Sequence, residues 1–313
     1  MLDPLALGYT PKYMRRKPLC VLAAGICALF STHALAAQPI PARDLWQFPL
    51  GAVLEPAAIA VEAGTGMWNP ASVAVPVGAR FRLGVAKLSA NQGVDGYLLG
   101  GSWRRPSGTT VGLSVAQASV DGLIRTETEP VSTGSILYSS ILISATVARQ
   151  IVPHVTLGIA ARYRDGRTDQ QDGSAIAGDV GIVIDSLPWH SLRIAASSFL
   201  WRPGRERDDQ PAFLSAIDAR VLANSVGPDI RLGYLHNVIK NGSAEDGPFA
   251  SARAGLLEVR AAYVITHAFG HTDSRARTGL ALHFARYVVG IGREEGVSGL
   301  GALYQFTLSS TIK

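Results

Sequence analysis

The chain has 313 residues, of which 47% are hydrophobic and 17% are charged. This length allows one large domain, and the charged share lies below the roughly 25% that is usual in soluble domains. Beyond the N-terminal region the sequence contains no run of about 18 apolar residues, which excludes a bundle of membrane-spanning helices.

Residues 1–36 are predicted to be a signal peptide, with Met14 as a candidate start. Residues 15–17 form a basic n-region, residues 19–30 form an apolar core, and residues 34–36 read Ala-Leu-Ala, an A-x-A cleavage site. Such a segment directs the mature chain out of the cytoplasm.

Both cysteines, Cys20 and Cys27, lie inside this segment, so the mature chain is expected to need no disulfide. Removal of residues 1–36 takes away four basic residues and one acidic residue and leaves 25 basic against 23 acidic residues. The sequence pI of 9.4 is therefore no argument for a nucleic-acid partner.

Residues 37–78 are rich in proline and alanine and lack alternation, so they are predicted to be a periplasmic or lumenal lead-in. From residue 79 onward, apolar residues alternate with polar or small ones, which is the period of a β-strand with one apolar face. The clearest copy is 155–164, whose apolar face carries Val155, Leu157, Ile159, Ala161 and Tyr163.

Residues 79–313 are predicted to form a closed antiparallel transmembrane β-barrel of about twelve strands. The predicted strands are 79–88, 94–104, 109–119, 134–149, 153–164, 174–185, 191–201, 212–223, 228–238, 253–266, 275–289 and 299–309. Short connections after the even strands alternate with longer polar ones, such as 165–173, 202–211 and 240–248. This asymmetry is typical of outer-membrane barrels, which have short periplasmic turns and long external loops.

A secreted soluble β-sandwich or barrel is the main alternative, because alternation alone does not say which face meets water. Strand length favours the membrane: tilted spanning strands need about 9–11 residues, whereas ordinary strands have about five or six.

Two motifs resemble a known group. Residues 69–74, Asn-Pro-Ala-Ser-Val-Ala, resemble the Asn-Pro-Ala-x-Leu-Ala element that precedes the barrel in FadL-like and PorV/PorQ-like outer-membrane proteins. Gly301, Tyr304 and Phe306 are similar to the C-terminal signal that the barrel-assembly machinery reads. Val73 in place of leucine and the seven residues after Phe306 depart from these patterns. The resemblance implies a barrel of fourteen strands, so fourteen are allowed beside the twelve counted.

Strand parity predicts that most charged side chains point into the lumen, because Arg or Lys facing the bilayer midplane costs roughly 2–4 kcal/mol. The candidate lumen-lining residues are Arg80, Arg82, Arg104, Arg162, Arg164, Asp179, Asp185, Arg193, Asp218, Arg220, Asp229, Arg231, Glu258, Arg260, Arg277 and His283. They are interpreted either as a self-neutralising network inside a closed barrel or as a basic path for anionic or amphiphilic solutes.

Motifs for catalysis, metals or cofactors are missing from the sequence. His267 and His271 have i, i+4 spacing but fall in a predicted turn, which indicates a solvated loop. His283 and Ser309 are a crude pair on the predicted lumen face. The chain is therefore predicted to be no enzyme and to hold no cofactor or metal.

The predicted function is passage or binding of small, hydrophobic or amphiphilic molecules in the bacterial outer membrane. FadL-like membership implies hydrophobic cargo, whereas the arginine-rich lumen favours polar or anionic cargo. The alternatives are a non-transporting scaffold or secretion-accessory barrel, which PorV-like membership implies, and a lipid-active outer-membrane enzyme. The predicted partners are outer-membrane lipid, the barrel-assembly machinery and an unidentified small molecule, without nucleic acid.

Overall fold

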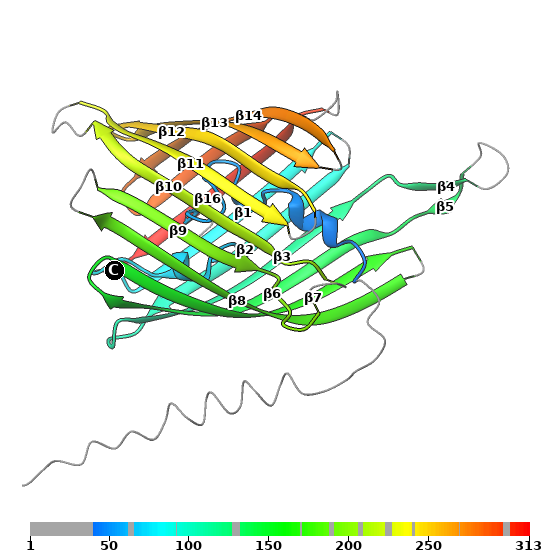
Figure 1. The fold of residues 1–313 in the computed structure, drawn as a ribbon, viewed down its shortest axis with the longest axis horizontal. Helices are drawn as coiled ribbons and strands as arrows, with labels where there is room; N and C mark the ends of the chain where they lie inside the picture. Colours follow the sequence, from blue (N-terminus) through cyan, green and yellow to red (C-terminus); the bar gives the residue numbers. More distant parts are fainter. Residues whose placement is uncertain are drawn as a thin grey trace, which may run out of the picture. The chain divides into compact units, whose positions relative to one another are not determined.

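Within the residues that the computed structural model describes, fourteen antiparallel strands close into one barrel (Figure 1). The described residues are 40–61, 66–91, 93–126, 132–169, 171–187, 191–205, 209–222, 227–239, 242–268, 270–296 and 301–313. The predicted signal peptide, residues 1–36, lies outside them.

The barrel strands are β1 (Phe81–Ala90), β2 (Val94–Arg104), β3 (Thr109–Val120), β6 (Tyr138–Val152), β7 (Val155–Thr168), β8 (Gln171–Leu187), β9 (Leu192–Phe199), β10 (Ala212–Leu222), β11 (Asp229–Ile239), β12 (Ala244–Ala254), β13 (Leu257–Ala268), β14 (His271–Phe284), β15 (Tyr287–Glu294) and β16 (Leu303–Ile312). Strands β4 (Ile124–Thr126) and β5 (Ser132–Ser135) pair only with each other. Two short 3-10 helices, η1 (Arg43–Gln47) and η2 (Pro70–Val73), precede the barrel.

The fourteen strands are two more than the twelve counted in the sequence and match the number that the prediction also allowed. Tight turns at Gly255–Leu256 and Ala285–Arg286 divide the predicted strands 253–266 and 275–289. At the second turn Ala285 itself has a φ of 51°, so no glycine, proline or asparagine marks it. The sequence therefore gives no sign that one strand ends and the next begins at this point.

Two predicted loops are mostly strand. Residues 165–173 continue the β7–β8 hairpin, in which Asp165 pairs with Ser174 and Thr168 with Gln171. Residues 244–248, predicted to lie in a loop, begin β12. The polar composition of these residues led to the loop prediction. Strands that extend beyond the hydrocarbon no longer need an apolar outer face, so their sequence resembles that of a loop.

Connections differ at the two ends of the barrel. At one end, called here the short-turn end, β6–β7, β12–β13 and β14–β15 are joined by two residues each. At the other, the long-loop end, β9 and β10 are joined by residues 200–211. The β4–β5 hairpin projects beyond the wall at the long-loop end (Figure 1). In outer-membrane barrels the long-loop end faces the outside.

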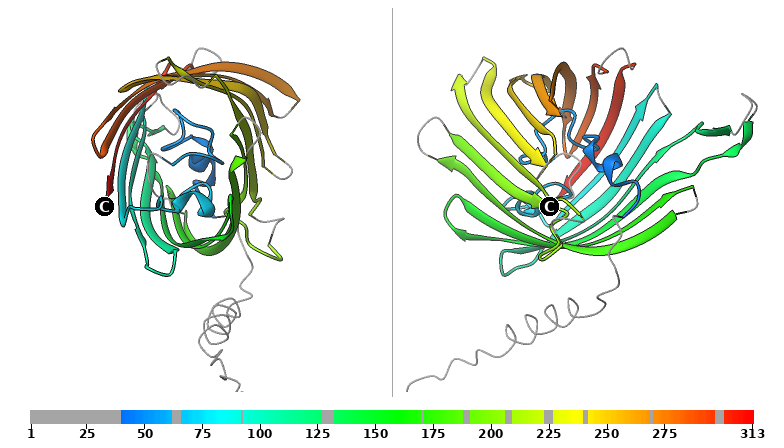
Figure 2. Two further views of the ribbon diagram at one scale, coloured as in Figure 1. Left: turned by 90° about the vertical axis from the view of Figure 1, so that its left-hand side faces the viewer. Right: turned by 45° about the vertical axis from the view of Figure 1, so that its right-hand side comes forward.

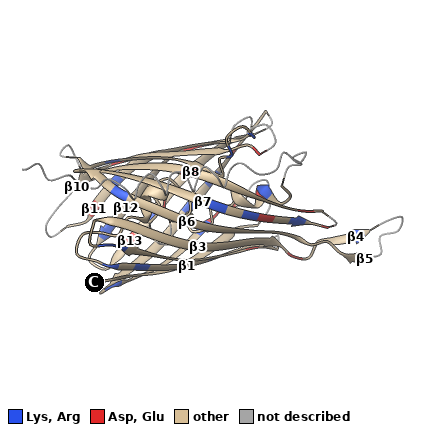
Figure 3. Ribbon diagram, turned by 90° about the horizontal axis from the view of Figure 1, so that it is seen from below, with Lys and Arg blue, Asp and Glu red and all other residues tan. Residues whose placement is uncertain are grey.

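The outer wall is apolar. On β7 the side chains of Leu157, Ile159 and Tyr163 point outward, and that of Ile159 is 52% exposed. The alternate residues Arg162 and Arg164 point inward and are buried. Most of the strand ribbon carries no charge (Figure 3). No helix among the described residues is long and apolar enough to cross a membrane.

The N-terminal lead-in fills part of the lumen. Its described residues 40–61 and 66–76, called here the plug, lie inside the ring of strands (Figure 2). Leu45, Trp46 and Leu50 are at most 4% exposed and pack in one core with inward residues of the wall. Burial of this apolar surface, at about 25 cal/mol per Å², holds the plug in the barrel.

Polar contacts fix the plug to two separate strands of the wall. The Trp46 indole Nε1 donates to Ser140 Oγ on β6 at 3.0 Å. The Gly51 N–H donates to Gln305 Oε1 on β16 at 2.7 Å. Both contacts are buried, so each satisfies groups that would otherwise be stranded away from water.

Candidate functional site

The motif at residues 69–74 forms the seat of the plug. The Asn69 side chain caps η2 by accepting from the Ala71 N–H at 2.9 Å. Its Nδ2 donates to the carbonyl of Ala58 at 2.7 Å and to that of Ile182 on β8 at 3.3 Å. Asn69 is fully buried. The segment is thus a turn, but one that ties two parts of the plug to the wall.

Glycines on β7 and β8 make room for this seat. A Cβ added at Gly158 would overlap the backbone of Pro70 and Ala71, and one at Gly181 would overlap the Asn69 side chain. The lack of a side chain at these two glycines therefore allows the motif to pack directly against the wall. Val73, which replaces the leucine of the family pattern, is fully buried.

An ion-pair cluster at the long-loop end connects the plug, the wall and an external loop. Asp209, 2% exposed, accepts from Arg164 Nη2 at 2.9 Å and pairs with the Arg43 guanidinium of η1 at 3.1 Å. Arg202 of the same loop lies 3.5 Å away. Burial lowers the pKa of Arg43 below its ordinary value. The carboxylates of Asp209 and Asp179 offset only part of this shift. The cluster is called here the latch.

The latch corrects one expectation for the loop 202–211. That segment was predicted to be a long polar loop on the outside, but Asp209 within it turns inward and is buried. Pro203 and Gly204 of the same loop are exposed. The sequence contains no signal that distinguishes Asp209 from the neighbouring charged residues.

A cavity of about 410 Å³ lies between the plug and the wall, toward the short-turn end, and is lined by residues of β8–β16 and β1. Plug residues Ala52–Pro56, with Ile59 and Val61, form one side of it. Among the described residues that line it, seven arginines stand against five carboxylates. The arginines are Arg82, Arg193, Arg220, Arg231, Arg253, Arg260 and Arg277; the carboxylates are Glu55, Asp185, Asp218, Asp229 and Glu258.

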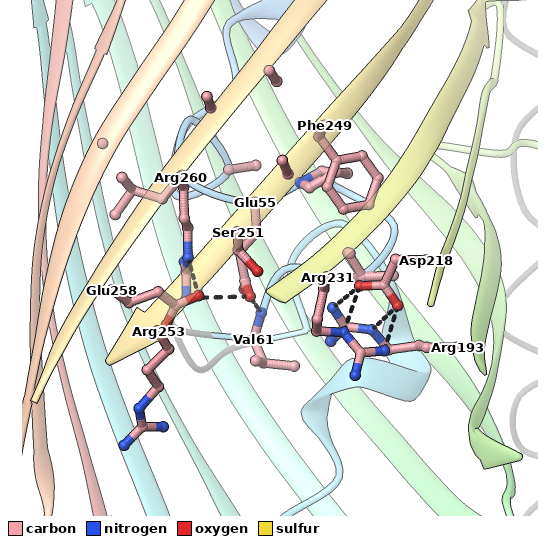
Figure 4. A pocket seen from close by; sticks show the side chains of 18 of the residues that line it. Glu55, Val61, Arg193, Asp218, Arg231, Phe249, Ser251, Arg253, Glu258 and Arg260 are labelled. Carbon is pink, nitrogen blue, oxygen red and sulfur yellow. Dashed lines mark hydrogen bonds and ion pairs between the residues drawn. The ribbon is translucent and has the colours of Figure 1, made fainter. Parts of the chain in front are cut away.

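Two clusters organise these charges (Figure 4). Arg193 and Arg231 both bind Asp218, each with a shortest N–O distance of 2.7 Å. On the neighbouring wall Glu258 accepts from Arg260 Nε at 2.8 Å and contacts His283 Nε2 at 2.7 Å. Since two guanidiniums share one carboxylate in the first cluster, it keeps an excess of positive charge.

Arg82 is one of the lining arginines with an unused donor. Its Nη1 is buried and has no hydrogen-bond partner among the described residues. The neighbouring strands place Ser102 and Thr311 opposite it. A buried guanidinium with an unused donor is a site where an anionic group would replace lost hydration.

The structure places the sequence-predicted residues in three groups. The cavity-lining group is Arg82, Asp185, Arg193, Asp218, Arg220, Asp229, Arg231, Glu258, Arg260, Arg277 and His283. Arg162, Arg164 and Asp179 are buried deeper in the barrel, where Arg162 binds Asp179 and Arg164 joins the latch. Arg104 donates to the carbonyl of Val75 at 2.8 Å, and Arg80 is exposed at the short-turn end.

Several charged residues of the lumen were not predicted. Glu245 and Arg275, with Glu294, form a further cluster around Arg277. Glu245 had been assigned to a loop, and correct parity on β12 would have found it. Glu55 and Arg43 belong to the plug, whose irregular backbone has no period from which an inward direction could be derived.

His267 and His271 lie on β13 and β14 and not in the turn that was predicted for them. His267 faces outward and contacts Thr272 Oγ1 at 3.0 Å, whereas His271 lies across the hairpin on the other face. His283 and Ser309 both line the cavity but sit two strands apart, each opposite Val288. No group of metal-binding side chains occurs among the described residues.

The C-terminal motif lies at the closure of the barrel. Tyr304 and Phe306 are on β16, which pairs with both β15 and β1, and their rings point outward at about half exposure. Gly301 precedes the strand. The strand continues to Ile312, so the residues after Phe306 complete the pairing with β1 rather than forming a separate tail.

The protein is a β-barrel of the bacterial outer-membrane type with an internal plug. It is similar to the Pseudomonas putida toluene transporter TodX, with a TM-score of 0.53 and 11% identity over 90% of this chain and 99% of that one. It is also similar to the Ralstonia pickettii toluene transporter TbuX, with a TM-score of 0.55 and 10% identity over 88% and 98%.

These likenesses confirm the predicted FadL-like barrel at the level of the fold. No family model matches the sequence, and no curated protein matches it.

Proposed function

We propose that the protein carries small polar or anionic molecules across the outer membrane, with the plug as its gate. The observation that supports this most directly is the basic cavity between the plug and the wall. TodX and TbuX are toluene transporters, so their fold is compatible with passage of small molecules. Their hydrocarbon cargo does not suit the lining of this cavity.

The lining favours an anion because of its charge. A hydrocarbon would strip water from the guanidiniums and carboxylates without replacing their hydrogen bonds, which is unfavourable. A carboxylate or phosphate group would accept from the unused donor of Arg82 and from arginines that share Asp218. The cavity volume suits a solute of about metabolite size.

Flux through the purified protein in planar bilayers tests this function. We expect conductance in salts of small carboxylates, with reversal potentials that show a preference for the anion. Absence of steady conductance and of solute uptake into proteoliposomes would contradict transport. It would favour the non-transporting scaffold, for which the buried plug and its paired charges provide the support.

Arg82→Gln is expected to lower the preference for anions. A unit charge about 4 Å from an anion contributes roughly 1–4 kcal/mol, depending on the local dielectric, so the anion-to-cation permeability ratio should fall by about fivefold or more. Arg80→Gln is the matched control, because Arg80 is exposed outside the cavity. Equal effects of the two changes in reversal-potential measurements would show that the cavity does not select the solute.

Asp209→Asn is expected to loosen the plug. The change leaves Arg43 and Arg164 without their carboxylate, and removal of one member of a buried pair costs about 3–5 kcal/mol. Single-channel recordings should therefore show more frequent and larger openings. Asp165→Asn is the control, since its partner Arg167 is largely exposed at the same end of β7. If the openings of Asp209→Asn were unchanged, the latch would not be what keeps the plug closed.

A further inference from the structure

Three polar residues lie directly opposite one another on the outer wall near the long-loop end. Ser215 on β10 pairs with His236 on β11, and His236 pairs with Asp246 on β12. Their side chains share the outward face, because the residues two positions away, Phe213 and Tyr234, are exposed on that face. The row points away from the cavity and takes no part in the proposed transport path.

The row holds the residue types of an acyl-transfer site in the order serine, histidine, aspartate. His236 Nδ1 binds Asp246 Oδ1, which orients the imidazole and leaves Nε2 for a second partner. The Ser215 hydroxyl donates to the His236 carbonyl at 2.8 Å. Side chains of directly opposed residues have Cβ atoms about 4.5–5.5 Å apart. A χ1 rotation of Ser215 therefore brings its Oγ to the imidazole.

The row lies toward the long-loop end of the wall, where an interface with lipid headgroups is expected. His236 and Ser215 each lie three residues from the long-loop ends of their strands. Phe213 and Tyr234, about half exposed on the same face, are aromatic residues of the kind that occupies the membrane interface. His236 is 53% exposed and Asp246 is 23% exposed in side-chain area. An ionisable pair on a lipid-facing wall is tolerated at that level but not at the bilayer midplane.

We propose that Ser215, His236 and Asp246 form a hydrolytic site for acyl esters of outer-leaflet lipids. The Ser215 Oγ attacks the ester carbonyl carbon while His236 takes the hydroxyl proton. The ester C–O bond then breaks, and the leaving alcohol takes that proton from His236. Water next attacks the acyl-serine, again passing a proton to His236. The fatty acid departs as Ser215 regains its hydrogen, so one ester and one water give one alcohol and one acid.

The sequence does not reveal this site, because its members are separated by 21 and 10 positions and Asp246 falls in a predicted loop. Only the register of three strands brings them together. Asp246 acts through His236 and is a positioning residue, whereas Ser215 and His236 contact the reacting atoms.

The purified full-length protein, reconstituted in vesicles, provides the test. Vesicles of phospholipid with a labelled acyl chain and vesicles containing lipopolysaccharide distinguish the two sources of ester. We expect release of fatty acid from one of them. A fluorophosphonate probe should label Ser215, as located by mass spectrometry. Ser215→Ala should remove both signals, and His236→Gln should lower them by about 10²-fold or more.

Ser89→Ala is the matched control. Ser89 lies on the outer face of β1 opposite Asp95 and Tyr304, so it has a carboxylate beside it but no histidine in its row. Its replacement should change neither signal. Asp246→Asn should lower labelling by about tenfold or more, and Asp246→Glu should restore most of it.

Heat-modifiable gel mobility shows whether each variant has folded. Labelling of Ser215 in the wild-type protein does not depend on the folding of any variant. Absence of probe on wild-type Ser215, together with no fatty acid from either kind of vesicle, would overturn the proposal. Acyl release that persists in Ser215→Ala would overturn it equally. Neither result bears on conductance, so the transport function is tested separately.

Discussion

Asp179→Ala is expected to destabilise the folded barrel by about 3–5 kcal/mol, because it strands a buried cation. Asp179 Oδ2 binds Arg162 Nε, and both side chains are 0% exposed. Asp179 Oδ1 also accepts from the Trp201 N–H at 3.0 Å. What remains around Arg162 is neutral: Ser144 Oγ at 2.9 Å and the ring of Phe199 at 5.2 Å. Urea titration of unfolding from lipid vesicles measures the loss.

Asp169→Ala is the control for this change. Asp169 pairs with Arg125 at the long-loop end, and the two side chains are 40% and 36% exposed. Exposed pairs contribute about 0–1 kcal/mol, so this variant should unfold close to the wild type. A similar, small loss in both variants would show that Arg162 finds water or another acceptor inside the barrel.

Ile159→Arg is expected to cost roughly 2–4 kcal/mol of folding free energy in a bilayer. Ile159 points outward from the apolar part of β7, between Val147 and Val180 on the neighbouring strands. A guanidinium there must enter hydrocarbon, thin the bilayer locally or extend toward the interface. Refolding into lipid vesicles across a urea series measures the difference.

Thr156→Arg tests the sidedness of the same strand. Thr156 shares the inward face with Gly158 and Arg162 and lies near the short-turn end. An arginine at this position meets the polar lumen or water and should cost less than Ile159→Arg. Equal losses in the two titrations would mean that β7 does not separate a lipid face from a lumen face.

The two proposals place separate chemistry on the two faces of one wall. Inside, Asp218 on β10 and Arg231 on β11 belong to the cavity. Outside, Ser215 and His236 on the same strands form the polar row. Because successive residues of a strand alternate between faces, residues three or five positions apart lie on opposite faces, one toward the lumen and one toward lipid. A substitution on one face can therefore be assayed with the other face as an internal control.

The sequence predicted the barrel from local information. Alternation along 155–164 determined which side chains of β7 face lipid, since the period of a strand is fixed by its backbone. The same parity placed Arg162, Arg164 and Asp179 on the inner face. The cost of a charge in hydrocarbon is large enough that a spanning strand must show it in its own residues.

Local information failed where a turn carries no marker or where the chain has no period. Ala285 takes a left-handed conformation that its residue type does not announce, so β15 was not counted. Strand β12 was missed because its first residues were assigned to a loop. The plug follows an irregular path, and its position depends on contacts with distant wall residues such as Ser140 and Gln305. Residues of this kind show their partners only when the chain is folded.

The amino-acid sequence by itself determined the alternation of faces along the strands, from which a membrane barrel and the inward direction of charges such as Arg162 and Arg164 were predicted. The tertiary structure alone decided which of those charges meet. Arg164 and Arg82 were both predicted to line the lumen, but Arg164 binds Asp209 in the latch, whereas Nη1 of Arg82 has no hydrogen-bond partner among the described residues. Alternation is a property of one strand, while ion pairs, the cavity and the outer row depend on register and on the course of the plug, which are set by contacts between residues far apart in sequence.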